Sequence, residues 1–289
     1  MTCRVDAHTR VAALYGHPVS HSLSPALQNA AFNKLNMNVI YLTFNVTNEE
    51  LPRAVESVRN LNFLGLNLTH PHKRAVLSCL DHVSEQAGQI AAVNTVVNRQ
   101  GILTGYNTDG DGFLRSLHED YEFQPRGKRI VILGAGGAGR AISWALGRED
   151  PERMTVVNRT IGRARKWAER ISARALAWED PQVHREIERA HLLVNAAAVP
   201  LEVNADLISE GALVYDIVYN QERPDLAEKI RGRGARWADG RSLLLHQGAL
   251  AFELWTGRQA PLAVMRQALR DASKRGIISR KQEQGEKRC

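Results

Sequence analysis

The sequence predicts an α/β protein of two domains, each built around a mostly parallel sheet, with C-terminal helices that return to the first domain. Three observations predict this class. Short apolar runs alternate with helical patterns through the first 110 residues, a second series of this kind begins near residue 129, and two helical patterns follow residue 242. Such alternation is typical of βαβ units. A chain of 289 residues is long enough to bury two separate cores.

The first domain is predicted over residues 1–111. Ser24 and Pro25 form a pair typical of a helix start, an N-cap followed by proline at the first helical position. Thr47 and Glu50 predict a capping box for the next helix. The strands are expected at residues 11–16, 39–46 and 63–68, and at 92–98 and 102–107, which are spaced as a hairpin.

The second domain is predicted over residues 112–243, after a change of composition at Gln124-Pro125-Arg126-Gly127. Its strands are expected in the segments RIVIL, MTVVN, HLLVN and ALVYD. Two further helices, in LLLHQGALAFELWTG and PLAVMRQALRDA, are expected to complete the first domain with residues 244–273. Residues 274–289 are strongly polar and are predicted to form a flexible, frayed, basic tail.

Composition excludes several classes of protein. The formal charge is +7, but residues 274–289 alone carry +4, so we expect no nucleic-acid partner. No apolar run approaches the roughly 20 residues of a membrane helix, so we expect no membrane association. The three scattered cysteines suit neither a disulfide framework nor a metal cluster, which favours a reducing, cytoplasmic location without a bound metal. The expected partner is a small molecule, and both a monomer and a homodimer are compatible with the sequence.

A glycine-rich turn follows the apolar strand at residues 130–133. The pattern G-x-G-x-x-G between a strand and a helix is typical of a Rossmann-type dinucleotide site, because the glycines let the backbone approach a pyrophosphate at a helix N-terminus. A tight turn without a ligand is the alternative, which the context of strand, helix and second strand disfavours. The residues of the turn are Gly134, Ala135, Gly136, Gly137, Ala138 and Gly139.

The end of the next strand predicts which dinucleotide binds. A strand that serves NAD usually ends in an acidic residue, which holds the ribose hydroxyls. Here the strand ends in Asn158, Arg159 and Thr160, so no carboxylate repels a 2′-phosphate. Arg159 and Arg163 are placed to bind that phosphate, and NADP, as NADPH, is therefore the predicted cofactor.

Four short segments of the first domain gather polar groups where strands are predicted to end, the edge at which open α/β sheets bind ligands. They are HSLSP (21–25), NLTHPHK (67–73), AVNT (92–95) and YNTDGDG (106–112). Their hydroxyl and amide groups suit a polyhydroxylated carboxylate. We expect Ser22 and Ser24 to bind the carboxylate, and Asn67 and Asn94 to lie around the hydroxyls.

Lys73 and Asp109 are the predicted acid/base pair. Hydride delivery to a ketone leaves a developing alkoxide, which needs a proton and a nearby positive charge. An ammonium group paired with a carboxylate supplies both. Each residue also has a purely structural alternative, since Lys73 lies beside a predicted helix start and Asp109 in a turn-forming sequence. The histidines of these segments lack metal-ligand spacing and are expected in loops.

Taken in order, these segments resemble the shikimate dehydrogenase family: GHPVSHSLSP, GLNLTHPHK, AVNT, GYNTDGDG, GAGGAG, NRT, DIVYN and QGALAFELWTG. The resemblance covers residues 11–271. It implies a substrate domain completed by the C-terminal helices, followed by a Rossmann-type NADP-binding domain. It also implies NADPH-dependent, reversible reduction of 3-dehydroshikimate to shikimate, a step of chorismate and aromatic amino acid biosynthesis.

The resemblance also implies roles for single residues. Lys73 and Asp109 match the family's catalytic pair, and Ser22 and Ser24 match its carboxylate-binding serines. Further substrate-binding roles fall on Thr69, Asn94, Tyr219 and Gln247, and a cofactor-binding role on Gly240.

Three segments depart from the family's usual pattern. Residues 195–200 read NAAAVP in place of NATSxGM, DIVYN is followed by Gln-Glu-Arg-Pro, and LLLHQ replaces MLxxQ. The lost glycine in the first segment restricts the backbone. Two alternatives therefore stay open: a dehydrogenase of quinate or a related hydroxy-acid, and a weakly active NADP-binding paralogue that acts as a sensor.

Overall fold

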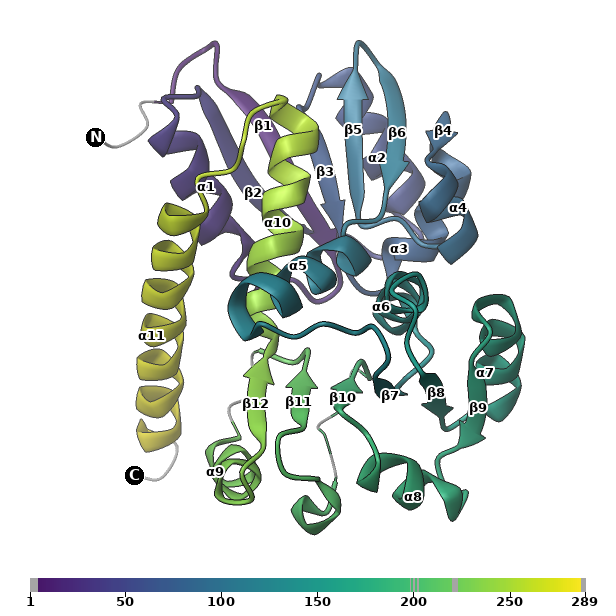
Figure 1. Ribbon diagram of the computed structural model, residues 1–289. Coiled ribbons are helices and arrows are strands. Elements are labelled where there is room, and N and C mark those ends of the chain that lie inside the picture. The colour runs from purple at the N-terminus through teal and green to yellow at the C-terminus, as the bar shows by residue number, and fades with distance from the viewer. Residues whose placement is uncertain (1–4, 198, 200, 202, 220–222, 287–289) are drawn as a thin grey trace. The chain divides into compact units, whose positions relative to one another are not determined.

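The computed structural model describes residues 5–197, 199, 201, 203–219 and 223–286, with side chains as far as residue 275. The chain divides into two compact units (Figure 1), each with its own six-stranded sheet. Unit 1 comprises Met1–Thr108 and Leu245–Cys289, and unit 2 comprises Asp109–Leu244. Among the described residues, no helix is both long enough and apolar enough to cross a lipid bilayer.

Unit 1 has a mixed sheet. Its strands are β1 (Arg10–Gly16), β2 (Val39–Asn45), β3 (Gly65–Leu68), β4 (His82–Val83), β5 (Thr95–Arg99) and β6 (Ile102–Tyr106). They lie in the order β2-β1-β3-β5-β6-β4. β1 pairs in parallel with β2 and β3, whereas β5 runs antiparallel to β3 and β6. The predicted hairpin is therefore confirmed as β5 and β6.

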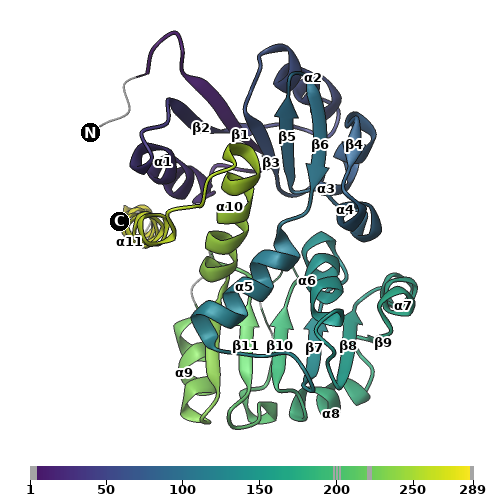
Figure 2. The same cartoon turned by 45° about the horizontal axis from the view of Figure 1, so that its top comes forward.

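Helices cover both faces of this sheet (Figure 2). They are α1 (Ser24–Lys34), α2 (Leu51–Asn60), α3 (His72–Ala75), α4 (Glu85–Ile90), α11 (Leu262–Glu286) and the part of α10 (Gly240–Thr256) that begins at Leu245. The side chains of β1 alternate between the two faces. Tyr15 points to α2, where its hydroxyl donates to the carbonyl oxygen of Ala54 at 3.2 Å.

The C-terminal helices pack on unit 1, as the sequence predicted. Trp255 of α10 is buried, and its Nε1 donates to the carbonyl oxygen of Val96 at 2.9 Å. Gly65 makes room for this ring, because a Cβ at that position would overlap the indole. Arg99 donates to the carbonyl oxygens of Leu254 and Trp255 at 3.0 and 3.1 Å, which satisfies the last turn of the helix.

Unit 2 has an all-parallel sheet of the Rossmann type. Its strands are β7 (Arg129–Leu133), β8 (Arg153–Asn158), β9 (Arg174–Ala177), β10 (Leu192–Asn195), β11 (Leu213–Asp216) and β12 (Arg236–Asp239). They lie in the order β12-β11-β10-β7-β8-β9. The chain runs from β7 outward to β9 and then returns to the other side of β7. Ligands of such sheets bind at the carboxyl ends of the strands, where the order reverses.

The strands of unit 2 are buried because helices cover them. The helices are α5 (Asp109–Tyr121), α6 (Gly137–Gly147), α7 (Ile161–Ala168), α8 (Gln182–Glu188) and α9 (Pro224–Gly232). The residues of β7 from Ile130 to Leu133 are all apolar and at most 1% exposed. A continuous apolar run of this kind is typical of a central parallel strand.

Several local predictions need correction. α1 begins at Ser24, but the residue before it is Leu23 and no side chain caps the helix. Ser22 provides a partial substitute for the missing cap, because its Oγ accepts from the N–H of Ser24 at 3.2 Å. The capping box at Thr47 is half present. The N–H of Thr47 donates to Glu50 Oε2 at 2.9 Å, but the helix starts only at Leu51.

Other elements were missed. β4 has only two residues, and β9 (RALA) and β12 (RWAD) lack the continuous apolar run that marked the equally short β10 and β11. Residues 274–286, predicted to be frayed, continue α11 as helix as far as Glu286. The Lys, Arg, Gln and Glu residues of this segment have high helix propensity. Residues 287–289 lie outside the described part of the chain.

Candidate active site

The polar segments of unit 1 meet at one edge of its sheet. β1 and β3 end at this edge, and β5 begins there because it runs antiparallel to β3. AVNT therefore precedes a strand and does not end one, which corrects the prediction. The N–H of Thr69 donates to Tyr15 O at 3.0 Å, and the N–H of Leu68 donates to Asn94 O at 2.9 Å. Thr69 and Asn94 thus share this edge.

Asn94 is the centre of a buried hydrogen-bond network. Its Oδ1 accepts from the N–H of Thr108 at 2.8 Å, and its Nδ2 donates to Thr108 Oγ1 at 3.0 Å. Nδ2 also lies 3.4 Å from Oε1 of Gln247 on α10. Asn94 is only 2% exposed, so little water competes for these bonds. Two residues predicted to bind substrate, 153 positions apart in sequence, are therefore in contact.

The side chain of Asn67 forms most of its hydrogen bonds with other groups of the protein. Its Nδ2 donates to Asn94 O at 3.1 Å and to Thr95 Oγ1 at 3.0 Å. Its Oδ1 accepts from the hydroxyl of Tyr41 at 2.8 Å. Both amide hydrogens are used, which leaves only acceptor capacity for a ligand. Asn67 thus acts first as a support for the backbone of Asn94.

Ser22 and Ser24 lie at the start of α1. Ser24 is 8% exposed, and Ser22 is half-buried. Pro25 follows at the first turn, where a missing N–H costs nothing. The N-terminal end of a helix presents unpaired N–H groups and a partial positive charge, both of which favour an anion. Two hydroxyl groups at this position suit a carboxylate.

Lys73 lies in α3, and its backbone is held in place. The carbonyl oxygen of Lys73 accepts from the N–H of Val93 at 2.7 Å. Its neighbour His72 is fully buried, and Nε2 of His72 donates to the carbonyl oxygen of Val46 at 2.7 Å. Burial lowers the pKa of His72, which favours the neutral imidazole. The segments after β2 and before β5 therefore both fix the backbone at Lys73.

Asp109 is 4% exposed and is the first residue of both α5 and unit 2. Its sequence, DGDG, opens a helix of 13 residues and not the turn considered from the sequence. Gly110 explains the pattern, because a Cβ there would lie 2.6 Å from the carbonyl oxygen of Ala141 on α6. Asp109 directly follows Thr108, which Asn94 holds. The segment 93–94 thus anchors the backbone beside both predicted acid/base residues.

In unit 2 the glycine-rich turn joins β7 to α6. Gly134 has a φ of +109°, a region that favours glycine, and its N–H donates to Val157 O at 2.7 Å. A Cβ at Gly134 would lie 2.9 Å from the backbone nitrogen of Ala197. Gly136 precedes α6 and faces open space. Gly137, Ala138 and Gly139 form the first turn of that helix, so the turn leaves backbone N–H groups accessible to a pyrophosphate.

The end of β8 lies beside this turn. Asn158 Oδ1 accepts from the N–H of Ala135 at 3.2 Å, and Asn158 Nδ2 donates to Thr160 O at 3.0 Å. Asn158 therefore connects the glycine-rich turn to the start of α7. Arg159, Thr160 and Arg163 are exposed there. The segment 158–163 contains no carboxylate, so the guanidinium groups can bind a phosphate without a competing negative charge nearby.

Two predicted residues lie at the ends of β11 and β12. Gly240 begins α10, and a Cβ there would overlap the carbonyl oxygen of Ile217, so close packing requires glycine at this position. Tyr219 follows β11 and is half-buried. Of the segments that depart from the family pattern, Ala198, Pro200, Gln221 and Glu222 lie outside the described residues.

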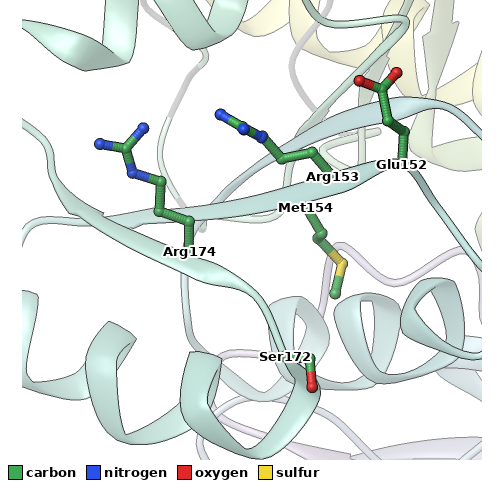
Figure 3. A pocket seen from close by; sticks show the side chains of 5 residues that line it. All are labelled: Glu152, Arg153, Met154, Ser172 and Arg174. Atoms are coloured by element: carbon green, nitrogen blue, oxygen red, sulfur yellow. The ribbon is translucent and has the colours of Figure 1, made fainter.

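A pocket lies at the opposite edge of the unit-2 sheet, where β8 and β9 begin (Figure 3). Its lining residues are Glu152, Arg153, Met154, Ser172 and Arg174. Glu186 lies 2.8 Å from Arg174 and 3.6 Å from Arg153, so both guanidinium groups are already paired. This edge carries none of the predicted site residues. In the part of the chain that the structure describes, no group of three or more His, Cys, Asp or Glu side chains could hold a metal ion.

Comparison with known proteins identifies the family. The substrate binding domain of shikimate dehydrogenase matches residues 14–96, shikimate / quinate 5-dehydrogenase matches residues 118–210, and the shikimate 5′-dehydrogenase C-terminal domain matches residues 240–270. The NADP(+) shikimate dehydrogenase of Methanopyrus kandleri is 46% identical over 279 residues, which cover 92% of this chain and 96% of that protein. The chain belongs to the shikimate dehydrogenase family.

Solved structures related to this family share the fold. Shikimate 5-dehydrogenase of Thermus thermophilus, in complex with shikimate, is 38% identical with a TM-score of 0.84, and the match covers 92% of this chain and 99% of that one. Quinate dehydrogenase of Corynebacterium glutamicum, in complex with NAD, is 30% identical with a TM-score of 0.82 over 91% and 99%. The predicted family and fold class are thus confirmed.

Sequence reasoning missed residues that support the site. Thr95 and Thr108 hold the amides of Asn67 and Asn94, and Gly110 lets α5 pack closely against α6. The two threonines stand inside AVNT and YNTDGDG, so their positions were visible. What was not visible is that their hydroxyl groups are hydrogen-bonded to the side chains of Asn67 and Asn94.

Proposed function

We propose that this family member catalyses the NADP-dependent, reversible reduction of 3-dehydroshikimate to shikimate. The observation that carries the proposal is the buried network of Asn94, Thr108 and Gln247, which joins three distant segments at the sheet edge. Thr108 holds Asn94 in this network, and a preorganised polar strand edge of this kind suits a small ring with several hydroxyl groups. The membership in the family supports this substrate, and the reaction belongs to chorismate and aromatic amino acid biosynthesis.

The substrate carboxylate is assigned to Ser22 and Ser24, at the start of α1. The ring hydroxyls are assigned to Thr69, Asn94, Gln247 and Tyr219, with Asn67 supporting Asn94 from behind. This division follows the roles that the family resemblance implies, and it agrees with the chemistry, because hydroxyl donors at a helix N-terminus suit an anion. Amides, which both donate and accept, suit neutral hydroxyl groups. In this proposal residues 1–111 and 244–273 form the substrate domain.

Lys73 and Asp109 are assigned to the acid/base step. NADPH, when bound, supplies the hydride to the ketone carbon. The ammonium group of Lys73 is assigned to stabilise the developing alkoxide and to supply a proton to it, with Asp109 as its acid/base partner. The fixed backbone at Lys73 supports this role, since general acid catalysis needs the proton held within hydrogen-bond reach.

The residues of unit 2 fit NADP. Gly134 to Gly139 leave a turn that a pyrophosphate can approach, because Gly136 faces open space. The exposed guanidinium groups of Arg159 and Arg163 are assigned to the 2′-phosphate, with Asn158 and Thr160 shaping the segment between. Gly240 is assigned to the cofactor site because the family resemblance implies it, and it packs against Ile217 in the segment after β11. Residues 112–243 form the cofactor domain in this proposal.

A substrate panel with both cofactors tests the function. The purified protein should oxidise NADPH rapidly with 3-dehydroshikimate, and reduce NADP with shikimate. Absence of turnover with 3-dehydroshikimate across a range of pH would reject the proposal. Binding of NADPH without turnover of any substrate in the panel would favour the sensor, and equal use of NADH would reject the roles of Arg159 and Arg163.

Quinate is the second candidate substrate. It is favoured by the match to the shikimate / quinate description over residues 118–210 and by the altered segment at 195–200. The ratio of kcat/KM for shikimate and quinate decides between the two. For either reaction we propose a cytoplasmic enzyme with a small-molecule substrate and no nucleic-acid partner. Its state as monomer or homodimer is open to measurement by sedimentation.

A further inference from the structure

Asn195 and Asp216 are the last residues of β10 and β11, and they lie opposite each other in the parallel register. Nδ2 of Asn195 donates to Oδ1 of Asp216 at 2.9 Å. Each residue is only 1% exposed. Burial raises the pKa of Asp216, whereas hydrogen bonds from the N–H of Val218 and from Asn195 lower it. A carboxylate kept in such a place has an energetic cost, which suggests a specific role.

Each member of the pair also holds the segment that follows its own strand. Asn195 Oδ1 accepts from the N–H of Ala197 at 3.3 Å, and Asn195 Nδ2 donates to Val199 O at 3.1 Å. Asp216 Oδ1 accepts from the N–H of Val218 at 3.1 Å. One side-chain pair therefore shapes the two segments that begin at Ala196 and Ile217.

Both segments belong to the edge at which the dinucleotide is proposed to bind. The N–H of Ala196 donates to Leu133 O at 2.8 Å, and a Cβ at Gly134 would lie 3.0 Å from Ala196 O. On the other side, Gly240 packs against the carbonyl group of Ile217. The segment at Ala196 is thus in contact with the glycine-rich turn.

The sheet order indicates which half of the cofactor these segments face. In Rossmann-type sheets the pyrophosphate lies at the turn after the first strand and the adenosine ribose at the end of the second, which here would be the ends of β7 and β8. A dinucleotide extends across the point where the strand order reverses, so its other half lies toward β10 and β11. That half carries the reacting nicotinamide.

We infer that Asn195 and Asp216 form a positioning pair, which sets the backbone beside the nicotinamide and so controls the rate of hydride transfer more than the affinity for either ligand. The inference rests on the proposed function, since it needs a nicotinamide cofactor. Neither residue is assigned a contact with the reacting atoms. They act through the segments at Ala196 and Ile217.

Three single variants test the pair. Asp216→Ala removes both accepted bonds, while Asp216→Asn keeps an oxygen that can accept from Asn195 and Val218. Tyr215→Phe is the matched control on the same strand, because it breaks a buried bond of 2.8 Å to Ser116 Oγ inside the core. Melting temperature, kcat, both KM values and the kinetic isotope effect with NADPH deuterated at the transferred hydride are measured for each.

The expected result is a separation of rate from affinity. Asp216→Ala should lower kcat by about tenfold to 100-fold and raise the isotope effect, with KM values within about threefold, because misplacement of the ring slows only the chemical step. Asp216→Asn should stay near the wild type. Tyr215→Phe should have a lower melting temperature than the wild type but the same kcat. Equal losses of kcat in Asp216→Ala and Tyr215→Phe, or none in Asp216→Ala, would overturn the inference.

A swap keeps the test decisive if Asp216→Ala fails to fold. Asn195→Asp places two carboxylates together and should lower kcat. The double variant Asn195→Asp/Asp216→Asn restores an amide that donates to a carboxylate, although the carbonyl oxygen of Val199 loses its donor. Partial recovery of kcat relative to Asn195→Asp is expected, and a folded double variant with kcat no higher than that of Asn195→Asp would contradict the pair. The fluorescence of bound NADPH gives a readout that needs no substrate. It should differ between wild type and Asp216→Ala even if 3-dehydroshikimate proves not to be the substrate.

Discussion

The candidate substrate edge in unit 1 and the candidate cofactor edge in unit 2 are built from different groups. In unit 1, buried side chains hold one another: the amides of Asn67 and Asn94 bond to Thr95 and Thr108. In unit 2, close backbone approach does most of the shaping, as at Gly134, and the arginines that are proposed to bind phosphate are exposed. The first edge is preorganised by side-chain hydrogen bonds. The second is preorganised mainly by close backbone packing at glycines, supported by the buried pair of Asn195 and Asp216.

This difference indicates how each edge responds to substitution. A side-chain network recognises a ring with several hydroxyl groups, but each amide in it is costly to replace because its buried partners lose their bonds. A backbone cradle recognises a phosphate through N–H groups that every residue except proline carries, so its shape depends on the glycines and on the few side chains, such as Asn158, that hold the backbone. The substitutions described next test this contrast at the two edges. They are arranged by decreasing expected effect on activity, binding or stability.

The largest effect is expected from Lys73→Ala. Loss of the ammonium group should lower kcat for ketone reduction by roughly 10²- to 10⁴-fold, the usual contribution of a positioned acid or base. NADPH affinity, measured by fluorescence, should stay the same, because the substitution lies in unit 1. Arg74→Ala, at the exposed neighbouring position, is the control and should keep its turnover. Wild-type turnover in Lys73→Ala would remove the lysine from the mechanism.

Gly134→Ala is expected to have the next largest effect, and it tests the backbone cradle. The new methyl group would meet the backbone of Ala196 and Ala197 at a φ of +109°. Strain of about 1–3 kcal/mol is expected, together with a loss of NADPH affinity measured by calorimetry. Gly127→Ala has the same kind of strain, with a φ of +66°, but open space around it. That control should lose stability and keep NADPH affinity, and parallel losses of affinity would argue against the cradle.

Arg159→Ala should have a smaller and more selective effect. Removal of one charge-assisted bond costs about 1.5–3 kcal/mol, which corresponds to roughly 10- to 100-fold weaker binding of NADPH. Binding of NADH should not change, since it lacks the 2′-phosphate. Arg165→Ala, also exposed but further along α7, is the control. A variant that loses both cofactors equally would assign Arg159 to folding and not to phosphate recognition.

The smallest effect concerns the pH dependence of the protein's stability, to which the buried His72 contributes. Burial lowers the pKa of His72 from its ordinary value of 6.5, so the unfolded chain takes up a proton before the folded chain does. Stability should therefore fall as the pH drops below about 6.5, toward the lower pKa of the folded state. In His72→Gln, which keeps a donor for Val46 O, the melting temperature should fall by about 1–3 °C less between pH 7 and pH 5.5. Identical pH profiles would show that His72 does not titrate in this range.

Much of the fold was predictable because it follows from local periodicity. The strands near residues 11–16, 39–46 and 130–133 were evident as apolar runs, and the hairpin was evident from its spacing. The strands β4, β9 and β12 were not, since β4 has two residues and charged residues interrupt the apolar runs of the other two. The helix at Asp109 was missed because glycine is rare inside helices, and only the packing of α5 on α6 explains Gly110.

The site was predictable in composition but not in its connections. The four polar segments and the glycine-rich turn were each visible in the sequence. The contact between Asn94 and Gln247 was not, because it depends on where α10 packs. The pairing of Asn195 with Asp216 also escaped notice, since it requires the register between β10 and β11. Side chains that support a site resemble those that bind a ligand until their partners are known.

By itself, the sequence determined the alternation of strands and helices, the order of the motifs and the absence of an acidic residue after β8. These are local properties, set by side-chain periodicity and by the conformational freedom of glycine. The tertiary structure alone decided which amides are bound by the protein and which face outward, and which strand ends share an edge. Those outcomes depend on sheet order and on contacts between residues far apart in the chain, which no local pattern encodes.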